Sequence, residues 1–217
     1  LNLDLFKRNL QSEIEAYPFR LHLIPLTQRD GIQLADELAD SLRFETAKDY
    51  EDWLGRMKNF PAYMDQTIAL MRRGIAEHIV QPKIVMQRVP GQIDRQIEGK
   101  PEEHPFLAPF AKFPTQFTQS LRERLKTEAL QAVREQVVPA YKKFKAFFVG
   151  EYLPACFDEV GAWQLPRGHE CYAHLAHKFT TTSLSPKEIH EIGLTEVARI
   201  TTEMEKVRQT VKFAGSL

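Results

Sequence analysis

Two His-Glu dipeptides are the residues of this chain whose types point most directly to chemistry. His169-Glu170 and His190-Glu191 look like the start of an HExxH zinc-peptidase helix, in which two imidazoles bind zinc and the glutamate activates water. That helix needs its second histidine four residues after the first, so that both rings leave the same face. Ala173 and Leu194 stand at those two positions. The dipeptides therefore predict no metal site, and no other set of three ligands replaces them.

A second histidine cluster surrounds the first dipeptide. Glu170, His174 and His177 share a helical face at steps of four and three, and Cys171 lies one turn before His174. These side chains could hold zinc, but short histidine clusters on polar helix faces are common, so we favour a solvated or interface face. For His190 we favour a partly buried ring bonded to a backbone carbonyl over a catalytic base, which would need a pocket and an orienting partner.

Two other groups of side chains have structural explanations. The run Thr180–Thr182 predicts local bonding between hydroxyls and backbone in a turn. Tyr50, Trp53, Phe60 and Tyr63 could form an aromatic binding platform, but their helical spacing favours burial in a core, where large rings cover the most area.

The composition of the chain and the motifs that it lacks exclude several classes of protein function. The chain has 217 residues, 43% of them apolar, and 29 basic residues balance 29 acidic ones. The large positive field of a nucleic-acid-binding protein is therefore absent, and we expect no nucleic-acid partner. No apolar stretch approaches the ~20 residues that span a bilayer. Phosphate-binding glycine loops and the GxSxG nucleophile elbow are also missing, and the two cysteines form no CxxC pair.

The sequence predicts that the elements positioning the candidate site residues are helices. A first helix should end near Tyr17-Pro18, because the residue before proline is pushed out of the α region. Thr46 is a predicted N-cap, with Asp49 favoured in the first turn by the helix dipole. Asn59-Phe60-Pro61 predicts a boundary between that helix and a second one ending near Pro82.

Prolines divide the middle of the chain. Pro90-Gly91 should kink or split a helical stretch over residues 83–96. Residues 99–114 contain too many prolines for a regular element and predict an ordered loop packed by phenylalanines. The next helix should be kinked or interrupted at Pro139 and stop before Pro154.

The last third of the chain gives the clearest pattern. Ser185-Pro186-Lys187-Glu188 is a capping box with proline at the first helical position, so a helix starts there and should run unbroken beyond Met204. Its apolar stripe consists of Ile189, Ile192, Val197, Ile200, Met204, Val207 and Val211. Such a helix is about 40 Å long and needs an equally long partner. We therefore expect apolar surface to stay uncovered, and we expect Gly215 to cap the helix end.

These patterns together predict an all-α protein, an irregular multi-helix array with long amphipathic helices. No segment alternates apolar and polar residues as a strand would. The helical periodicity is already present in the first residues after Leu1, and no polar tail precedes Leu217. We therefore expect residues 1–217 to be one helical domain or subdomain of a longer chain.

Several segments resemble the bacterial family catalogued as domain of unknown function 885. The specific matches are Gly161–Gly168, Tyr172, Thr180–Thr182, Leu184–Pro186, Glu188–His190, Ile192–Leu194 and Glu196–Ile200. The weaker ones are Phe19–Gln28, Asn59–Pro61, Pro139–Tyr141 and Glu151–Pro154. The similarity covers nearly the whole chain. Family members commonly carry a second tyrosine beside Tyr172, where this sequence has Cys171.

The resemblance implies a larger, mainly helical protein similar to zinc metallopeptidases and often exported, periplasmic or lipid-anchored in bacteria. In that family the metal site centres on a His-Glu followed shortly by Pro-Gly-His, downstream of the matched region. This implies no metal ligand and no catalytic residue within residues 1–217, while zinc is expected in the intact protein.

Two hypotheses follow from different function classes. In the first, the chain is the N-terminal helical segment of a zinc-dependent, peptidase-like hydrolase and forms a scaffold and a wall of the substrate cleft. Its partners are then the remainder of the same polypeptide and a peptide substrate. The resemblance implies, by motif match alone, that Tyr172, Thr181 and His190 bind this peptide. In the second, the chain is a non-catalytic helical module that binds a peptide or protein. A complete His-Glu and Pro-Gly-His segment in the longer protein favours the first.

Overall fold

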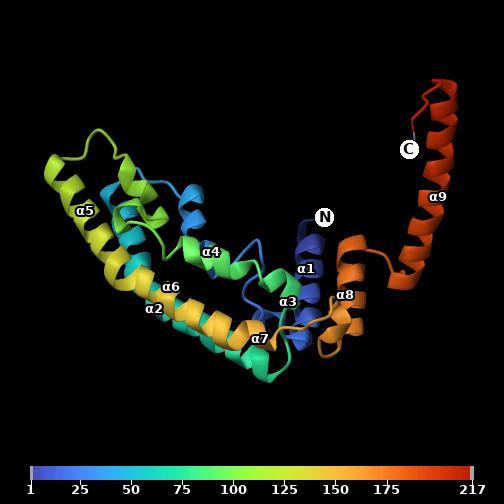
Figure 1. Cartoon of the computed structure of the whole chain (residues 1–217), viewed down its shortest axis with the longest axis horizontal. Helices are drawn as coiled ribbons and strands as arrows, with labels where there is room; N and C mark the ends of the chain where they lie inside the picture. Colours follow the sequence, from blue (N-terminus) through green and yellow to red (C-terminus); the bar gives the residue numbers. More distant parts are fainter. Residues whose placement is uncertain (1, 216–217) are drawn as a thin grey trace. The chain divides into compact units, whose positions relative to one another are not determined.

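Helices are the regular elements of this protein (Figure 1). The computed structural model describes residues 2–215, and within them one isolated bridge between Pro82 and Phe157 is the extent of β pairing. The all-α expectation is confirmed for this range. The expectation of a longer chain also rested on Leu1 at the start of the sequence and on the residues up to Leu217 at its end. Residues 1, 216 and 217 lie outside the described range.

The chain divides into two compact units. We call Arg20–Pro166 the central unit, and we call Leu1–Phe19 together with Arg167–Leu217 the terminal unit. Compact units are not by themselves independently folding domains. The expectation of one helical domain or subdomain over residues 1–217 therefore stays a prediction.

Two long helical runs side by side form the frame of the central unit (Figure 1). The first is α2 (Ala47–Ala76), which begins at a capping box formed by Thr46 and Asp49, as predicted. The second run consists of α5 (Gln119–Ala132), α6 (Val138–Phe147) and α7 (Leu153–Ala155), joined by the π-helical turns η6 (Val133–Val137) and η7 (Phe148–Tyr152).

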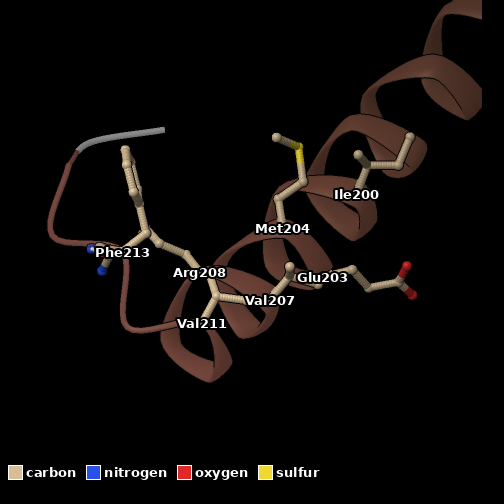
Figure 2. A pocket seen from close by; sticks show the side chains of 7 residues that line it. All are labelled: Ile200, Glu203, Met204, Val207, Arg208, Val211 and Phe213. Atoms are coloured by element: carbon tan, nitrogen blue, oxygen red, sulfur yellow. Dashed lines mark hydrogen bonds between the residues drawn. The ribbon is translucent and has the colours of Figure 1, made fainter.

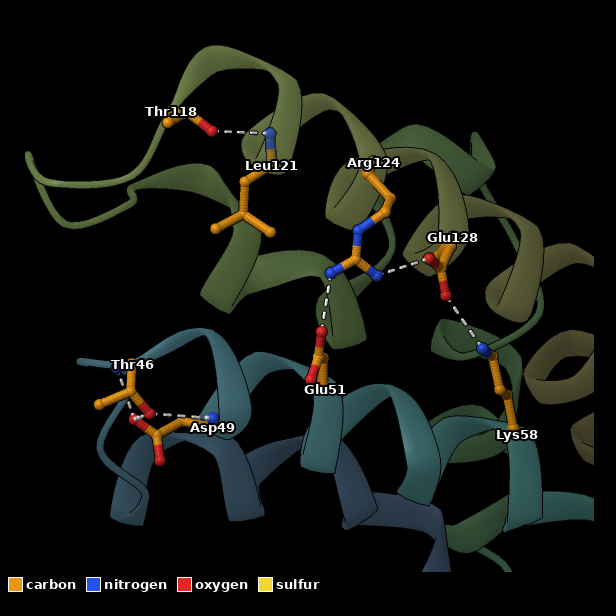
Figure 3. A network of polar contacts seen from close by, with 8 residues as sticks. All are labelled: Thr46, Asp49, Glu51, Lys58, Thr118, Leu121, Arg124 and Glu128. Atoms are coloured by element: carbon orange, nitrogen blue, oxygen red, sulfur yellow. Dashed lines mark hydrogen bonds and ion pairs between the residues drawn. The ribbon is translucent and has the colours of Figure 1, made fainter.

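Within the described residues, four ion pairs join the two runs. The residues on α2 lie seven positions apart, which is about two helical turns and so keeps them on one face. The pairs are Glu51 with Arg124 at 2.7 Å, Lys58 with Glu128 at 3.0 Å, Asp65 with Lys143 at 2.6 Å and Arg72 with Glu151 at 2.6 Å. Figure 3 shows the first two, with Arg124 also bonded to Glu128. Residue numbers rise together along both runs, so the runs are parallel.

The helical course continues through Pro61, Pro139 and Pro154, in a different way at each. Pro61 lies inside α2, so the expected boundary at Asn59-Phe60-Pro61 is wrong. The reason is burial, because Met57, Phe60 and Met64 on either side of the proline are all in the core. Burying each such side chain contributes roughly 1.5–3 kcal/mol, enough to offset the cost of about 3 kcal/mol for a proline inside a helix.

In the second run a π-helical turn precedes each proline. Val138 donates its backbone N–H to Val133, and Leu153 donates to Phe148, each across five residues. Pro139 and Pro154 follow directly and occupy the first turn of the next α segment, where a missing N–H is tolerated. The α-helix is therefore interrupted beside Pro139, as predicted, by the π-helical turn η6. The helical course nevertheless reaches Ala155, so the predicted stop before Pro154 is wrong.

Short helices connect the two runs. The split of residues 83–96 is confirmed as α3 (Lys83–Met86) and α4 (Val89–Arg95), and Pro90 lies in the first turn of α4. Within residues 99–114 the expected loop contains two 3₁₀ turns, η4 (Pro101–Glu103) and η5 (Pro105–Ala111). The remaining 3₁₀ segments are η1 (Tyr17–Phe19), η2 (Leu21–Leu23), η3 (Ile32–Ser41) and η8 (Ala162–Gln164).

The hydrophobic core of the central unit contains most of the predicted aromatic cluster. Tyr50, Trp53 and Phe60 are buried, as expected, and the Tyr50 ring contacts Phe44, Phe110, Phe113 and Phe117. Tyr63 differs, because its side chain is 57% exposed. The prediction for this one residue is wrong, since it lies on α2 beyond the edge of the buried stripe.

The terminal unit contains α1 (Asn2–Ala16), α8 (Gly168–Thr180) and α9 (Pro186–Thr210). The first helix ends where Tyr17-Pro18 predicted. It contacts α8 through an ion pair between Glu13 and Lys178 at 2.6 Å. The Phe19 ring packs beside His174, with 5.6 Å between ring centroids.

The start and length of α9 match the prediction, but its end does not. Ser185 and Glu188 form the capping box, and the helix passes Met204 without a break. It ends at Thr210, and Lys212 adopts the left-handed conformation with φ 55°. Phe213 then donates its N–H to Arg208, and Lys212 donates to Gln209, the two bonds of a Schellman motif. The expectation that Gly215 caps the helix is therefore wrong.

Candidate functional site

The three residues assigned to substrate binding all lie on the α8–α9 segment (residues 168–210) of the terminal unit. Tyr172 is in the second turn of α8, Thr181 caps the end of α8, and His190 is in the second turn of α9. All three are exposed, Tyr172 to 56%. Nine residues of helix put Tyr172 about 13 Å from Thr181 along the axis. The structure therefore spreads these side chains along a surface rather than gathering them in one pocket.

The turn between α8 and α9 is held by its own polar groups. The Thr180 hydroxyl donates to the Ala176 carbonyl at 2.8 Å and lies 3.0 Å from the Thr182 hydroxyl. The Thr182 N–H donates to the Thr180 hydroxyl, and a ring nitrogen of His177 bonds the Thr182 carbonyl at 2.6 Å. The predicted local bonding of the threonine run is confirmed.

Thr181 has the most unusual backbone in this turn. Its φ is 62°, and its N–H donates to the His177 carbonyl at 2.8 Å. Left-handed backbone is a genuine outlier for a β-branched residue, and it costs on the order of 1–3 kcal/mol. The sequence contains no signal for this conformation, because helices commonly end with glycine or asparagine at such a position.

The candidate metal ligands have other partners. Glu170 pairs with Arg167 at 2.5 Å, and this contact lowers the pKa of the Glu170 carboxyl. His177 bonds the turn, while His174 lies 4.0 Å from Glu15. Among residues 2–215 no three histidine, cysteine, aspartate or glutamate side chains gather as metal ligands. The donor set of this segment does not fit a zinc ion.

His190 differs from its sequence interpretation. It is exposed on α9 rather than partly buried. The reason lies in its helix, because no residue of Pro186–Thr210 is buried and the helix offers no core for the ring.

The two cysteines are poor nucleophiles. Burial raises the pKa of the Cys156 thiol to about 12, and its Sγ donates to the Tyr152 carbonyl at 3.3 Å. Burial also raises the pKa of Cys171. Because the thiolate is the reactive form, neither residue suits covalent catalysis at neutral pH.

An exposed apolar surface of the terminal unit follows α9. The expectation of an uncovered stripe is confirmed, since Ile192, Val197, Ile200, Met204, Val207 and Val211 are all exposed. Toward the end of the helix the stripe becomes a groove of about 460 Å³, lined by Ile200, Glu203, Met204, Val207, Arg208, Val211 and Phe213 (Figure 2).

Phe213 makes the groove concave. The left-handed turn at Lys212 folds the chain back, so that the Phe213 ring stands beside the helix face (Figure 2). Arg208 holds this turn by donating to the carbonyls of Phe213 and Gly215 at 3.2 and 3.3 Å. Sequence periodicity predicts the stripe but not this fold-back, because lysine carries no signal for the left-handed region.

Within the described residues, no helix is both long enough and apolar enough to cross a membrane.

Comparisons with known proteins place the chain in a family without assigning it an activity. A family model described as "Bacterial protein of unknown function (DUF885)" matches residues 1–217. No curated protein matches the chain.

A solved structure shares the fold. It is described as a crystal structure of "the putative lipoprotein from Colwellia psychrerythraea", and it superposes with a TM-score of 0.80 at 24% sequence identity. The match covers 89% of this chain and 34% of that one. The chain thus spans about a third of the length of the solved protein.

Proposed function

This chain belongs to the DUF885 family of bacterial proteins, and from that premise we propose that it forms the N-terminal scaffold and one cleft wall of a zinc-dependent, peptidase-like hydrolase. The supporting observation is the apolar stripe of α9, which is exposed from Ile192 to Val207. Exposed apolar patches of this extent mark interaction surfaces. The remainder of a longer polypeptide is the proposed partner, because the solved protein that shares this fold is well over twice as long as this chain.

Zinc and its ligands are proposed to lie outside residues 1–217. The expected ligand segment is a His-Glu followed shortly by Pro-Gly-His, and its glutamate would activate the attacking water. The donor groups of this chain do not fit the ion, so we assign them no step on the metal. What this chain contributes is binding and orientation of the peptide.

Tyr172, Thr181 and His190 are the proposed peptide contacts. Each side chain is exposed and carries a group that can exchange hydrogen bonds with a peptide backbone. The strained backbone of Thr181 adds support, since strain of this kind clusters at functional sites. An exported or lipid-anchored location is part of the same proposal, supported by the description of the Colwellia protein.

A non-catalytic peptide- or protein-binding module is the second candidate function. The groove at the end of α9 favours it, because an exposed apolar groove can dock the apolar face of an amphipathic partner without any chemistry.

Metal analysis and a peptide-library assay on the longer protein and on the 217-residue chain separate the two candidates. We expect about one zinc per molecule in the longer protein, hydrolysis of some peptide bond, and no stoichiometric zinc in the 217-residue chain. A metal-free longer protein would establish the binding-module alternative. Zinc retained by the 217-residue chain through His169, His174 or His177 would overturn the site assignment.

Variants of the longer protein test the peptide contacts. Tyr172→Ala and His190→Ala should each lower kcat/KM about tenfold, the size of one lost hydrogen bond, and leave the zinc content unchanged. Thr181→Gly relieves the backbone strain and removes only the side chain. A lower kcat/KM in this variant would therefore indicate a lost contact between the Thr181 side chain and the peptide, rather than unfolding. His169→Ala is the matched control, an exposed histidine outside the proposed contacts, and should stay within twofold of the parent.

A further inference from the structure

A pocket in the central unit belongs to none of the roles above. It has a volume of about 280 Å³ and lies between η3, α2 and η5. Trp53, Phe60 and Phe106 form its inner wall, and Leu38 and Tyr63 stand at its mouth. Every lining residue comes from the central unit, so the pocket exists independently of the α8–α9 segment.

The inner wall is held rigid by its own contacts. The indole N–H of Trp53 donates to the Phe106 carbonyl at 3.0 Å, and the two rings stack with 5.5 Å between centroids. Phe60 meets Phe106 edge-on at 5.4 Å. All three side chains are at most 5% exposed. The pocket is therefore preformed, and a ligand would not have to order these rings.

Polar groups line one edge of the pocket. Arg56, Asn59 and Tyr63 follow one another on α2 at steps of three and four, so they lie along one helix face. Asn59 is held by a bond from its Nδ2 to the Gly55 carbonyl at 2.8 Å. Arg56 is exposed and forms no ion pair with any residue in 2–215. Its guanidinium is thus a positive charge beside an aromatic cavity, and no carboxylate of the described residues lies within ion-pair distance of it.

We propose that this pocket binds a small carboxylate that carries an aromatic ring. The ring enters between Trp53, Phe60 and Phe106, where offset or edge-on contacts with three aromatic side chains are available. The carboxylate stays at the mouth and pairs with the Arg56 guanidinium, whose planar donors match a carboxylate.

The size of the pocket sets the size of the ligand. A dry cavity of about 150 Å³ holds one benzene ring. The 280 Å³ of this pocket therefore accommodates a ring with a short side chain but not a second ring system. An aromatic cation would fit the same aromatic wall. We exclude such a ligand because the positive charge of Arg56 repels it.

Fluorescence of Trp53 provides a direct readout. The chain contains two tryptophans, and Trp163→Phe leaves Trp53 as the single reporter. Titrating this variant of the 217-residue chain with 3-phenylpropanoate should give a saturable change with a dissociation constant on the order of 1 mM, as expected for about eleven heavy atoms. The alcohol 3-phenylpropan-1-ol should bind about fivefold more weakly, and 3-phenylpropylamine more weakly still.

Two substitutions in the same background locate the site. Arg56→Ala should weaken 3-phenylpropanoate about fivefold, the upper range for an exposed ion pair, and remove the preference for acid over alcohol. Leu38→Trp, at an exposed position on the mouth, should block entry and abolish the titration measured by ligand-detected NMR. Arg95→Ala removes an exposed arginine outside the pocket and should leave binding unchanged.

The result that overturns the proposal is equally direct. No saturable signal up to about 20 times the expected dissociation constant, from a chain whose circular dichroism shows intact helices, would rule out the site. Equal binding of acid, alcohol and amine, or no effect of Arg56→Ala, would rule out carboxylate recognition.

Discussion

At the scale of single residues, His104 shows how burial assigns a protonation state. Its side chain is buried, its Nε2 lies 3.0 Å from the Gln96 carbonyl, and the Phe106 N–H donates to its Nδ1 at 3.3 Å. One ring nitrogen must then carry the proton and the other must accept, which is the neutral tautomer. Desolvation lowers the pKa of His104, opposed in part by the Gln96 carbonyl and Asp36.

This histidine should make the free energy of unfolding depend on pH. Well above about pH 6.5, the usual pKa of histidine, the ring is neutral in both the folded and the unfolded chain. In that range His104 does not lower the free energy of unfolding. As the pH falls below that value, the unfolded chain binds a proton that the folded chain resists, so stability declines down to the lowered folded pKa. Urea unfolding between about pH 7.5 and pH 5 measures the slope.

The matched variant is His104→Gln, which keeps an acceptor and a donor but does not titrate. It should be less stable at about pH 7.5 and show a shallower decline below about pH 6.5. An unchanged slope in His104→Gln would mean that other groups cause the pH dependence.

At the scale of elements, α2 shows that packing overrides a proline. The helix runs through Pro61 because apolar side chains on both sides of it are buried, Met64 among them at 0% exposure. Local propensity alone would end the helix there.

Truncating a buried side chain next to Pro61 should therefore lower the free energy of unfolding. Met64→Ala should lower the free energy of unfolding by about 2–5 kcal/mol, because it removes buried surface and leaves a cavity. Tyr63→Ala, one residue earlier on the exposed side, should stay within about 0.5 kcal/mol. Chemical denaturation of both variants checks the difference, and equal losses would mean that burial of Met64 does not stabilise α2 across Pro61.

At the scale of the whole molecule, α9 carries an apolar stripe that no part of residues 2–215 buries. Surfaces of this kind promote association. The 217-residue chain should therefore bind a hydrophobic dye or self-associate.

The variant pair Val197→Lys with Val207→Lys places two charges on the stripe and should remove most of the dye signal and the self-association. Thr195→Lys with Thr202→Lys adds the same charges on the opposite face of α9 and should change neither. Light scattering and dye fluorescence measure both. A monodisperse parent chain without dye binding would show that the stripe is not an association surface.

The sequence by itself determined the features that depend on neighbouring residues. The capping boxes at Thr46 and Ser185, the end of α1 at Ala16, the local bonds of the threonine turn and the all-helical class all follow from interactions within a few positions of the chain. The family could also be read from it, since each matching motif lies within a few consecutive residues, and the family model covers residues 1–217.

Tertiary structure decided what depends on contacts between distant residues. Passage through Pro61 rests on burial in the core, and passage through Pro139 and Pro154 rests on two π-helical turns that periodicity does not encode. The Trp53 pocket joins η3, α2 and η5, which are separated by many residues along the chain. Burial is a property of the assembled fold, because the free energy that favours it comes from surfaces that meet only after the chain has folded.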